Sequence, residues 1–355
     1  MSTAQAQPGT PGPIAPTPVF ETAYSFIQTR VLATAIELDL LTPIKHGART
    51  VEALAASTGC SPRGLRILLN ALVAMGYLGK DGDQYALSPV AATFLAQDSP
   101  QYLGDYVTLI YAHPLMRRNW DSLSEVVQAG RLPNPTRTSA GGLTGESAAD
   151  AAEFFTQLVN PLYVASRPAA DAAAQVLCDG RAQGLRVLDV GAGSAVWSLA
   201  IARRDPHARV TAADLPDVIE KSTKRFAHRE AVEDRYDYLP GDFRQVDFGE
   251  SRYDVAVLGY VCHGEGARGT QALLARVHRA LKPGGQLLIA EALPDDERKT
   301  ALLPLIFAVL MLANTEEGDT FTLPEYREWL EAAGFRDIHT IEAPAPWPLI
   351  VSQRA

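Results

Sequence analysis

The chain has 355 residues, of which 47% are apolar and 21% carry a charge, and its formal net charge is −9. This length favours two domains, and the composition is typical of a soluble globular protein. The acidic balance argues against a dedicated nucleic-acid binder, which needs a basic face. No run of about 18 uncharged apolar residues occurs, so no membrane span is predicted.

Residues 1–19 are rich in Pro, Gly and Thr and carry no charged side chain. This composition predicts a disordered tail and not a secretory signal. The chain has three cysteines, Cys60, Cys178 and Cys262, which lie far apart in the sequence. They fit a reducing compartment and supply neither a disulfide framework nor a Cys-rich metal site. We therefore expect a cytoplasmic protein that binds no metal.

Residues 20–41 form the first predicted helix. Its apolar residues recur at spacings that are compatible with one buried helical face. The residues expected on this face are Phe26, Val31, Ala33, Ile36 and Leu38.

Residues 50–88 predict two short helices followed by a hairpin. Thr50 and Ser61 are the expected N-caps of the helices, and Asp81-Gly82-Asp83 is a hairpin turn signal. This order is a winged-helix pattern, which raises the possibility of DNA binding. The second helix, however, carries only Arg63 and Arg66 as cations, and a recognition helix needs several phosphate contacts. A packing or dimerisation module is therefore the preferred interpretation.

From residue 185 onward, predicted strands alternate with predicted helices. Apolar runs at 185–190, 208–214, 253–261 and 286–293 predict buried strands, and 337–343 and 348–353 close the chain as strands. Such alternation predicts an α/β fold with a doubly wound parallel sheet, whose ligand binds at the carboxyl ends of the strands.

The sharpest local motif is VLDVGAGSA, from Val187 to Ala195, at a predicted strand-to-helix turn. Gly191 and Gly193 allow the backbone to approach a ligand closely, and the helix that follows offers its N-terminus. Asp214 ends the next predicted strand, where a carboxylate is placed to bind ribose hydroxyls. The motif therefore predicts a nucleoside cofactor.

Two cofactor classes compete for this motif. A dinucleotide fingerprint requires a third glycine at position 196, which is Val196 here. Asp189, before the glycines, suits a cationic amino-acid group better than a pyrophosphate. Both observations favour S-adenosylmethionine, which carries an ammonium and a sulfonium and no phosphate.

Five motifs in a fixed order, VLDVGAGS, AADLP, GDF, LKPGG and EAAGF, are similar to those of class I S-adenosylmethionine-dependent small-molecule O-methyltransferases. The resemblance is to the plant-type and bacterial group that includes acetylserotonin, caffeate and anthracycline methyltransferases. It implies a Rossmann-like seven-stranded methyltransferase sheet over 166–355, preceded by a mainly helical winged-helix dimerisation domain over 20–165. It also implies a homodimer that acts on a small, aromatic secondary metabolite.

The resemblance further implies which residues hold the cofactor. Asp189, Gly191 and Gly193 belong to a glycine-rich cofactor loop, and Asp214 is the carboxylate that binds the ribose. Asp242 and Phe243 border the adenine, and Ser166 reaches the methionine carboxylate.

By the same resemblance, His263 is the catalytic base and Glu291 the carboxylate that orients it. The cofactor's methyl group is already electrophilic, so the protein must align the nucleophile and remove a proton. A histidine with an ordinary pKa near 6.5 suits the second task near neutral pH.

The chain departs from the family pattern around this histidine. Gly264 and Glu265 replace an Asp–Trp pair, Gly259 replaces a lysine, and a second glutamate aligns near Thr320. One alternative therefore remains open on the same fold, namely C- or N-methylation or a non-methylating use of the cofactor. The winged-helix pattern leaves open a second alternative, a DNA-binding regulator. The sequence does not identify the substrate.

Overall fold

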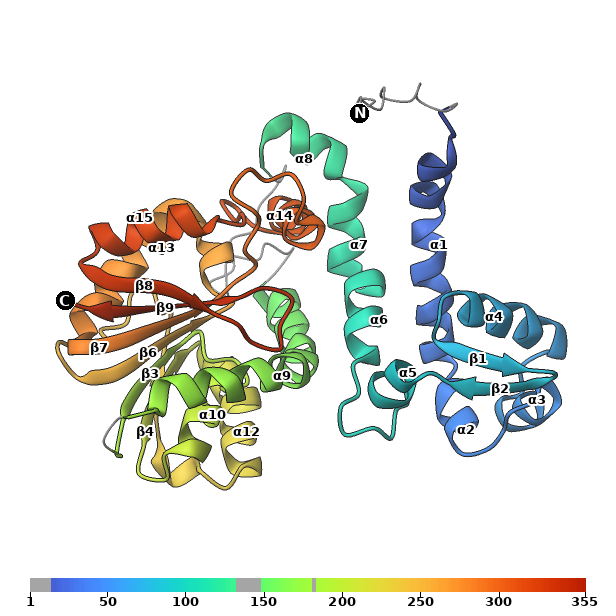
Figure 1. The fold of residues 1–355 in the computed structure, drawn as a ribbon, viewed down its shortest axis with the longest axis horizontal. Helices are drawn as coiled ribbons and strands as arrows, with labels where there is room; N and C mark the ends of the chain where they lie inside the picture. Colours follow the sequence, from blue (N-terminus) through green and yellow to red (C-terminus); the bar gives the residue numbers. More distant parts are fainter. Residues whose placement is uncertain (1–13, 132–147, 181–182) are drawn as a thin grey trace, which may run out of the picture. The chain divides into compact units, whose positions relative to one another are not determined.

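The computed structural model describes residues 14–131, 148–180 and 183–355 (Figure 1). By their internal contacts, residues up to Tyr111 form one unit and residues from Ala112 form a second. This division lies before the predicted functional boundary at 165/166, because the helices that follow Ala112 pack within the unit that holds the large sheet. The functional boundary itself stays a prediction. Most of the predicted tail lies outside the described residues.

The first unit combines helices with one hairpin. Thr50 and Ser61 cap α3 and α4 as expected, by accepting hydrogen bonds from the backbone N–H groups of Ala53 and Gly64. The hairpin follows α4 in the predicted order. Its classification as a winged helix stays a prediction. The elements are α1 (Thr17–Glu37), α2 (Leu41–Lys45), α3 (Val51–Thr58), α4 (Pro62–Ala74), β1 (Leu78–Asp81), β2 (Gln84–Leu87), α5 (Pro89–Phe94) and α6 (Gly104–Ala112), the last of which runs into the second unit.

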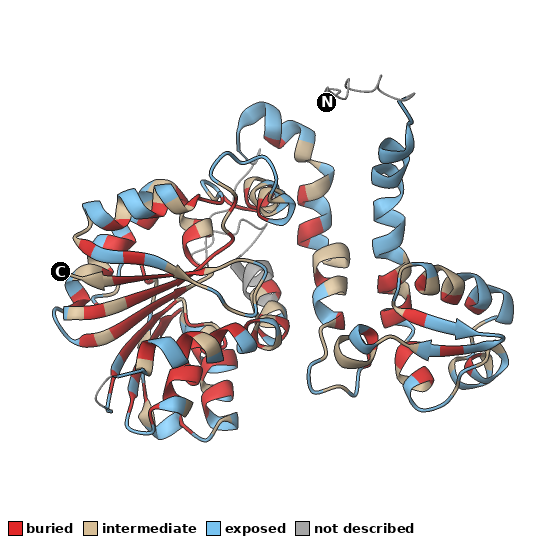
Figure 2. Cartoon of the chain, in the orientation of Figure 1, coloured by how far each residue is buried: buried red, intermediate tan, exposed pale blue. Residues whose placement is uncertain are grey.

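The expected buried face of α1 is only half correct. Ala33 and Ile36 are buried, but Phe26 is 62% exposed and Leu38 is 45% exposed. Figure 2 shows most of α1 in the pale blue of exposed residues. The residues of α1 that are buried all lie in its second half, and helical periodicity alone could not show which part of the helix packs against a core.

The second unit is built on a large sheet with helices on both faces (Figure 1). Its elements are α7 (Pro114–Asp121), α8 (Leu123–Ala129), α9 (Ala148–Cys178), β3 (Arg186–Val190), α10 (Val196–Arg204), β4 (Arg209–Asp214), α11 (Pro216–Val218), η1 (Ile219–Thr223), α12 (Lys224–Arg229), η2 (Glu233–Arg235), β5 (Tyr236–Pro240), β6 (Tyr253–Gly259), α13 (Cys262–Ala280), β7 (Leu281–Ala290), α14 (Leu302–Asn314), α15 (Leu323–Ala332), β8 (Phe335–Ile341) and β9 (Leu349–Arg354).

The sheet has seven strands in the order β5-β4-β3-β6-β7-β9-β8, which confirms the expected Rossmann-like sheet. The expectation that it is wholly parallel is wrong, because β9 is antiparallel to both β7 and β8. Residues 342–348, which connect β8 to β9, are too few for the crossover that a parallel neighbour requires. The strand order reverses between β3 and β6, which makes this the topological switch point of the sheet.

Alternate residues of the central strands face two separate cores. Val187, Val255 and Val257 pack with α9 and α10, whereas Leu188 and Leu258 pack with α13 and α15. Burial on both faces explains why these strands are continuous apolar runs in the sequence.

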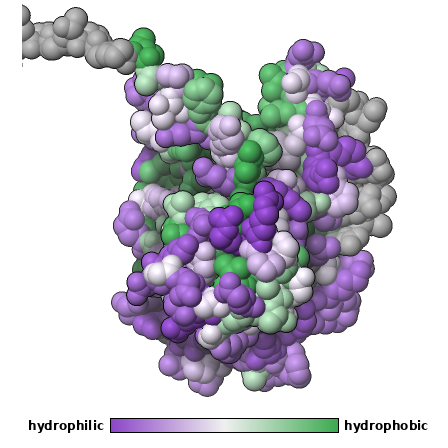
Figure 3. Space-filling view, turned by 90° about the vertical axis from the view of Figure 1, so that its right-hand side faces the viewer, coloured by the Kyte–Doolittle hydropathy of each residue, from purple (hydrophilic) through white to green (hydrophobic). Residues whose placement is uncertain are grey.

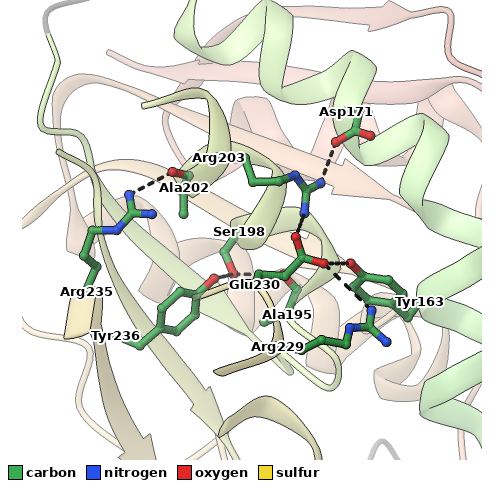
Figure 4. Close-up of polar contacts among 10 residues, drawn as sticks. All are labelled: Tyr163, Asp171, Ala195, Ser198, Ala202, Arg203, Arg229, Glu230, Arg235 and Tyr236. Atoms are coloured by element: carbon green, nitrogen blue, oxygen red, sulfur yellow. Dashed lines mark hydrogen bonds and ion pairs between the residues drawn. The ribbon is translucent and has the colours of Figure 1, made fainter. Parts of the chain in front are cut away.

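A polar network holds the middle of α9 against α10 and α12 (Figure 4). The Tyr163 hydroxyl donates to Glu230 at 2.5 Å, and the Arg203 guanidinium bridges Glu230 at 3.2 Å and Asp171 at 2.5 Å. The Tyr163 ring also stacks on Phe226, with centroids 4.5 Å apart. This network fixes the turn of α9 that precedes Ser166.

Candidate active site

The glycine loop leaves the carboxyl end of β3 in a left-handed backbone conformation. Gly191 and Gly193 have φ values of 65° and 52°. A Cβ at Gly191 would lie 2.7 Å from Cγ2 of Val261, so a larger residue there would both strain the backbone and displace Val261. Close packing therefore favours glycine most strongly at position 191.

Ala195 stands where the family loop has its third glycine. It is buried and has φ 56° as the N-cap of α10. The left-handed conformation costs an L-residue about 1 kcal/mol relative to glycine. The loop therefore keeps the glycine-type geometry at this position despite the alanine.

Asp214 fastens the loop to the end of β4. Its carboxylate accepts the backbone N–H of Gly193 at 2.8 Å and that of Leu215 at 2.7 Å. Burial raises the pKa of this carboxyl to about 6, and the two N–H donors oppose that rise. Asp214 is thus a buried hydrogen-bond acceptor at the sheet edge, and its contact with Gly193 fixes the position of the glycine loop.

Asp189, the next-to-last residue of β3, is almost fully buried. Ser198 donates to it at 2.5 Å and lies 3.1 Å from the Tyr236 hydroxyl (Figure 4). Burial raises the pKa of the Asp189 carboxyl to about 7, and the neighbouring Asp214 adds to the rise. Ser198 was missed by the sequence analysis, although its place one turn into the helix after the glycine loop was a usable signal.

Asp242 and Phe243 follow β5 at the same edge of the sheet. Phe243 is buried. The Asp242 carboxylate pairs with the Arg244 guanidinium, with Nε and Nη2 at 2.8–3.1 Å from its oxygens. Arg244 was not singled out in the sequence, and it limits the freedom of Asp242 to accept other donors.

His263 and Glu291 are brought together from the ends of two adjacent strands. His263 begins α13 just after β6, and Glu291 directly follows β7. The Glu291 carboxylate lies 2.7 Å from Nδ1 of His263 and also accepts the backbone N–H of Cys262 at 2.7 Å. A carboxylate only accepts, so Nδ1 carries the proton and Nε2 is the ring's free acceptor.

Residues that follow β7 pack around His263. The backbone N–H of Asp319 donates to the His263 carbonyl at 3.0 Å, and the Phe307 ring packs edge-on at 4.9 Å. Thr320, at the family's second glutamate position, is buried. Burial also raises the pKa of the Cys262 thiol well above its ordinary value, which disfavours a nucleophilic thiolate.

Ser166 lies in α9, three residues after Tyr163, and is buried. The glycine loop, Asp214, the Asp242–Phe243 pair and the His263–Glu291 pair all follow carboxyl ends of strands in one sheet. The residues fit S-adenosylmethionine, because the glycines let a ligand approach the backbone closely and the carboxylates of Asp189 and Asp214 are acceptors for an ammonium and for ribose hydroxyls. Among the described residues, no group of three or more His, Cys, Asp and Glu side chains is arranged to hold a metal.

Two family models match the chain. The O-methyltransferase domain matches residues 120–336, and the O-methyltransferase dimerisation domain matches residues 20–97. The chain belongs to the O-methyltransferase family. The methyltransferase match includes every residue of the glycine loop, as well as His263 and Glu291.

Known proteins resemble this chain over nearly its whole length. It is 31% identical to the tetracenomycin polyketide synthesis 8-O-methyl transferase TcmO of Streptomyces glaucescens, over 96% of this chain and 97% of the relative. It is 29% identical to the 3-hydroxy-5-methyl-1-naphthoate 3-O-methyltransferase of Streptomyces sahachiroi, over 93% and 92%.

The fold of this O-methyltransferase also matches a solved structure. Human N-acetylserotonin methyltransferase in complex with S-adenosylmethionine aligns with a TM-score of 0.79 and 23% identity, over 98% of this chain and 99% of the other. In the part of the chain that the structure describes, no helix has the length and apolar character needed to cross a bilayer.

Proposed function

We propose that this enzyme transfers a methyl group from S-adenosylmethionine to a hydroxyl group of an aromatic secondary metabolite. The observation that carries the proposal is the His263–Glu291 pair, which lies at the same sheet edge as the glycine loop and Asp214. The family membership and the cofactor of the human fold relative support the same cofactor here.

The chemistry divides between cofactor and protein. Bound S-adenosylmethionine supplies an activated methyl group. Nε2 of His263 takes the hydroxyl proton of the substrate, a contribution of about 10²–10⁴-fold for a positioned base. Glu291 holds the ring through Nδ1, so that Nε2 keeps its lone pair and the imidazolium that forms is stabilised.

The substrate class rests on two supports. Both curated relatives are named for O-methylation in polyketide or naphthoate chemistry. In this chain, the Phe307 ring lies edge-on to His263 and provides an apolar wall beside the base. A flat hydroxylated aromatic ring fits such a wall better than a charged or flexible substrate does.

Methylation of a hydroxynaphthoate tests this proposal. The purified enzyme with S-adenosylmethionine should increase the mass of the naphthoate by one methyl group and release S-adenosylhomocysteine. Carbon–proton NMR of the product should show a methyl ether. A C-methyl product would replace the proposal with the C-methylation alternative, and a panel of hydroxylated naphthoates and polyketides that yields no methylated product would contradict it.

We also propose that the chain acts as a homodimer in the cytoplasm and does not bind nucleic acid. The matched dimerisation domain includes most of α1, whose exposed apolar side chains need a cover: Val19, Phe20, Tyr24, Phe26 and Ile27. In Figure 3, green apolar surface lies directly beside the grey N-terminal residues.

Light scattering should give twice the chain mass, and Phe20→Asp combined with Phe26→Asp should shift the measured mass toward that of one chain. An unchanged mass would exclude α1 from the interface.

Cofactor affinity should depend on pH because Asp189 titrates near neutrality. A cationic ammonium favours the ionised carboxylate, whereas burial in the free enzyme holds the pKa of Asp189 near 7. Binding therefore releases a proton at low pH, and the affinity for S-adenosylhomocysteine should weaken roughly tenfold from pH 7.5 to 6. Calorimetry in two buffers of different ionisation enthalpy measures the released proton. Asp189→Asn should bind more weakly but without this pH dependence, and a flat wild-type profile would contradict the assignment.

A further inference from the structure

The switch point of the sheet brings two glycines side by side. Val190 of β3 pairs with Leu258 of β6, so the next residues, Gly191 and Gly259, are neighbours where the two strands end. Strand alternation places Gly259 on the face of the sheet that packs with α9 and α10, as for Val257. Ligands of doubly wound sheets bind in the crevice at this point.

The indole of Trp197 occupies the space that a side chain at Gly259 would fill. A Cβ at Gly259 would lie 2.4 Å from the indole Nε1 and 2.5 Å from Cδ1. Trp197 is only 4% exposed and lies in the first turn of α10, directly after the glycine loop. The absence of a side chain at Gly259 therefore makes room for the Trp197 indole, which lies at the switch point of the sheet.

The N–H group of this indole has no acceptor in the part of the chain that the structure describes. Within the described residues, Nε1 of Trp197 forms no hydrogen bond, and this atom is not completely enclosed by the protein. Buried indole N–H groups usually find a partner, because an unmade hydrogen bond is costly. A donor that is nearly buried, unpaired and still accessible at a ligand crevice is suited to a ligand acceptor.

We propose that the Trp197 indole N–H donates a hydrogen bond to the methionine carboxylate of bound S-adenosylmethionine or S-adenosylhomocysteine. The carboxylate is the only anionic group of either molecule. The indole lies in the first turn of α10, where the helix dipole and free backbone N–H groups favour an anion. The proposal rests on the proposed use of this cofactor, and Trp197 is a positioning residue for the amino-acid end.

Two ligands that differ only at that end test the assignment. 5′-Methylthioadenosine has the nucleoside and sulfur of S-adenosylhomocysteine but lacks its amino-acid portion. Trp197→Phe keeps an aromatic ring and removes the N–H, so it should raise the calorimetric Kd for S-adenosylhomocysteine about tenfold and leave that for 5′-methylthioadenosine within about twofold. Trp329→Phe, the same change in α15, should alter neither.

Gly259→Ala gives a second route to the same result. The new Cβ must displace the indole, so this variant should weaken S-adenosylhomocysteine binding with Trp197 itself intact. Equal weakening of both ligands by Trp197→Phe would show a packing role and overturn the carboxylate contact. Unchanged affinity for S-adenosylhomocysteine in both variants would also overturn it. If wild-type enzyme binds neither ligand, the proposed function itself fails.

Discussion

His263→Ala should lower kcat by about 10²–10⁴-fold at pH 7.5 while the Kd for S-adenosylhomocysteine stays the same. The variant removes the imidazole that the Glu291 carboxylate orients, and it leaves the glycine loop and Asp214 untouched. Steady-state methylation and calorimetry measure the two quantities. His228→Ala, at an exposed histidine far along the chain, is the matched control and should behave as wild type.

The pH dependence separates a base from a structural residue. Without His263, the substrate must lose its proton to water, so the activity of the variant should rise up to the pKa of a phenol, near 10. The activity of the wild type, which keeps its base, should depend less steeply on pH over the same range. A constant ratio of the two activities across this range would exclude His263 as the base.

Glu291→Gln tests the orienting partner in the same assay. The amide keeps the size of the side chain but removes the charge that stabilises an imidazolium. The histidine should become a weaker base, so the acid limb of the pH profile should move to lower pH and the plateau should fall. An unshifted limb with a lower plateau would indicate loss of positioning alone.

Asp214→Asn should raise the Kd for S-adenosylhomocysteine roughly 100-fold, the effect of losing about two hydrogen bonds to a charged acceptor. The carboxylate now accepts two backbone N–H groups, and an amide would turn its NH₂ toward one of them. The substitution should therefore disturb the glycine loop as well as the proposed contact with the ribose. Calorimetry at pH 8 measures the loss, and Asp217→Asn, at an exposed aspartate three residues later, is the control.

The fold should survive this substitution. The folded-state pKa of Asp214 lies above its ordinary value, so ionisation destabilises the folded state, and this contribution to stability falls as pH rises from about 4 to 6. A neutral amide escapes that penalty at pH 8, which offsets the lost hydrogen bonds. The Tm of the free variant should stay within a few degrees of wild type, and wild-type cofactor affinity in the variant would remove Asp214 from the site.

Local sequence signals were sufficient to predict many of the helices and strands of this protein and the position of its glycine loop. The structure contains the glycine motif with its flanking strand and helix, the apolar strand runs, and the caps at Thr50 and Ser61. Each of these signals depends on neighbours within a few residues. The same signals supplied the five ordered motifs that resemble the O-methyltransferase family, to which the chain belongs.

Only the tertiary structure decided how distant residues meet. The direction of β9 depends on how it pairs with β7. The 2.7 Å contact between His263 and Glu291 joins residues that are 28 positions apart. The packing of the Trp197 indole against Gly259 joins residues still further apart. Periodicity reports whether a face is apolar, and it does not report what covers that face. For this reason the exposed Phe26 and the unpaired Trp197 N–H became visible only when the packing around them was known.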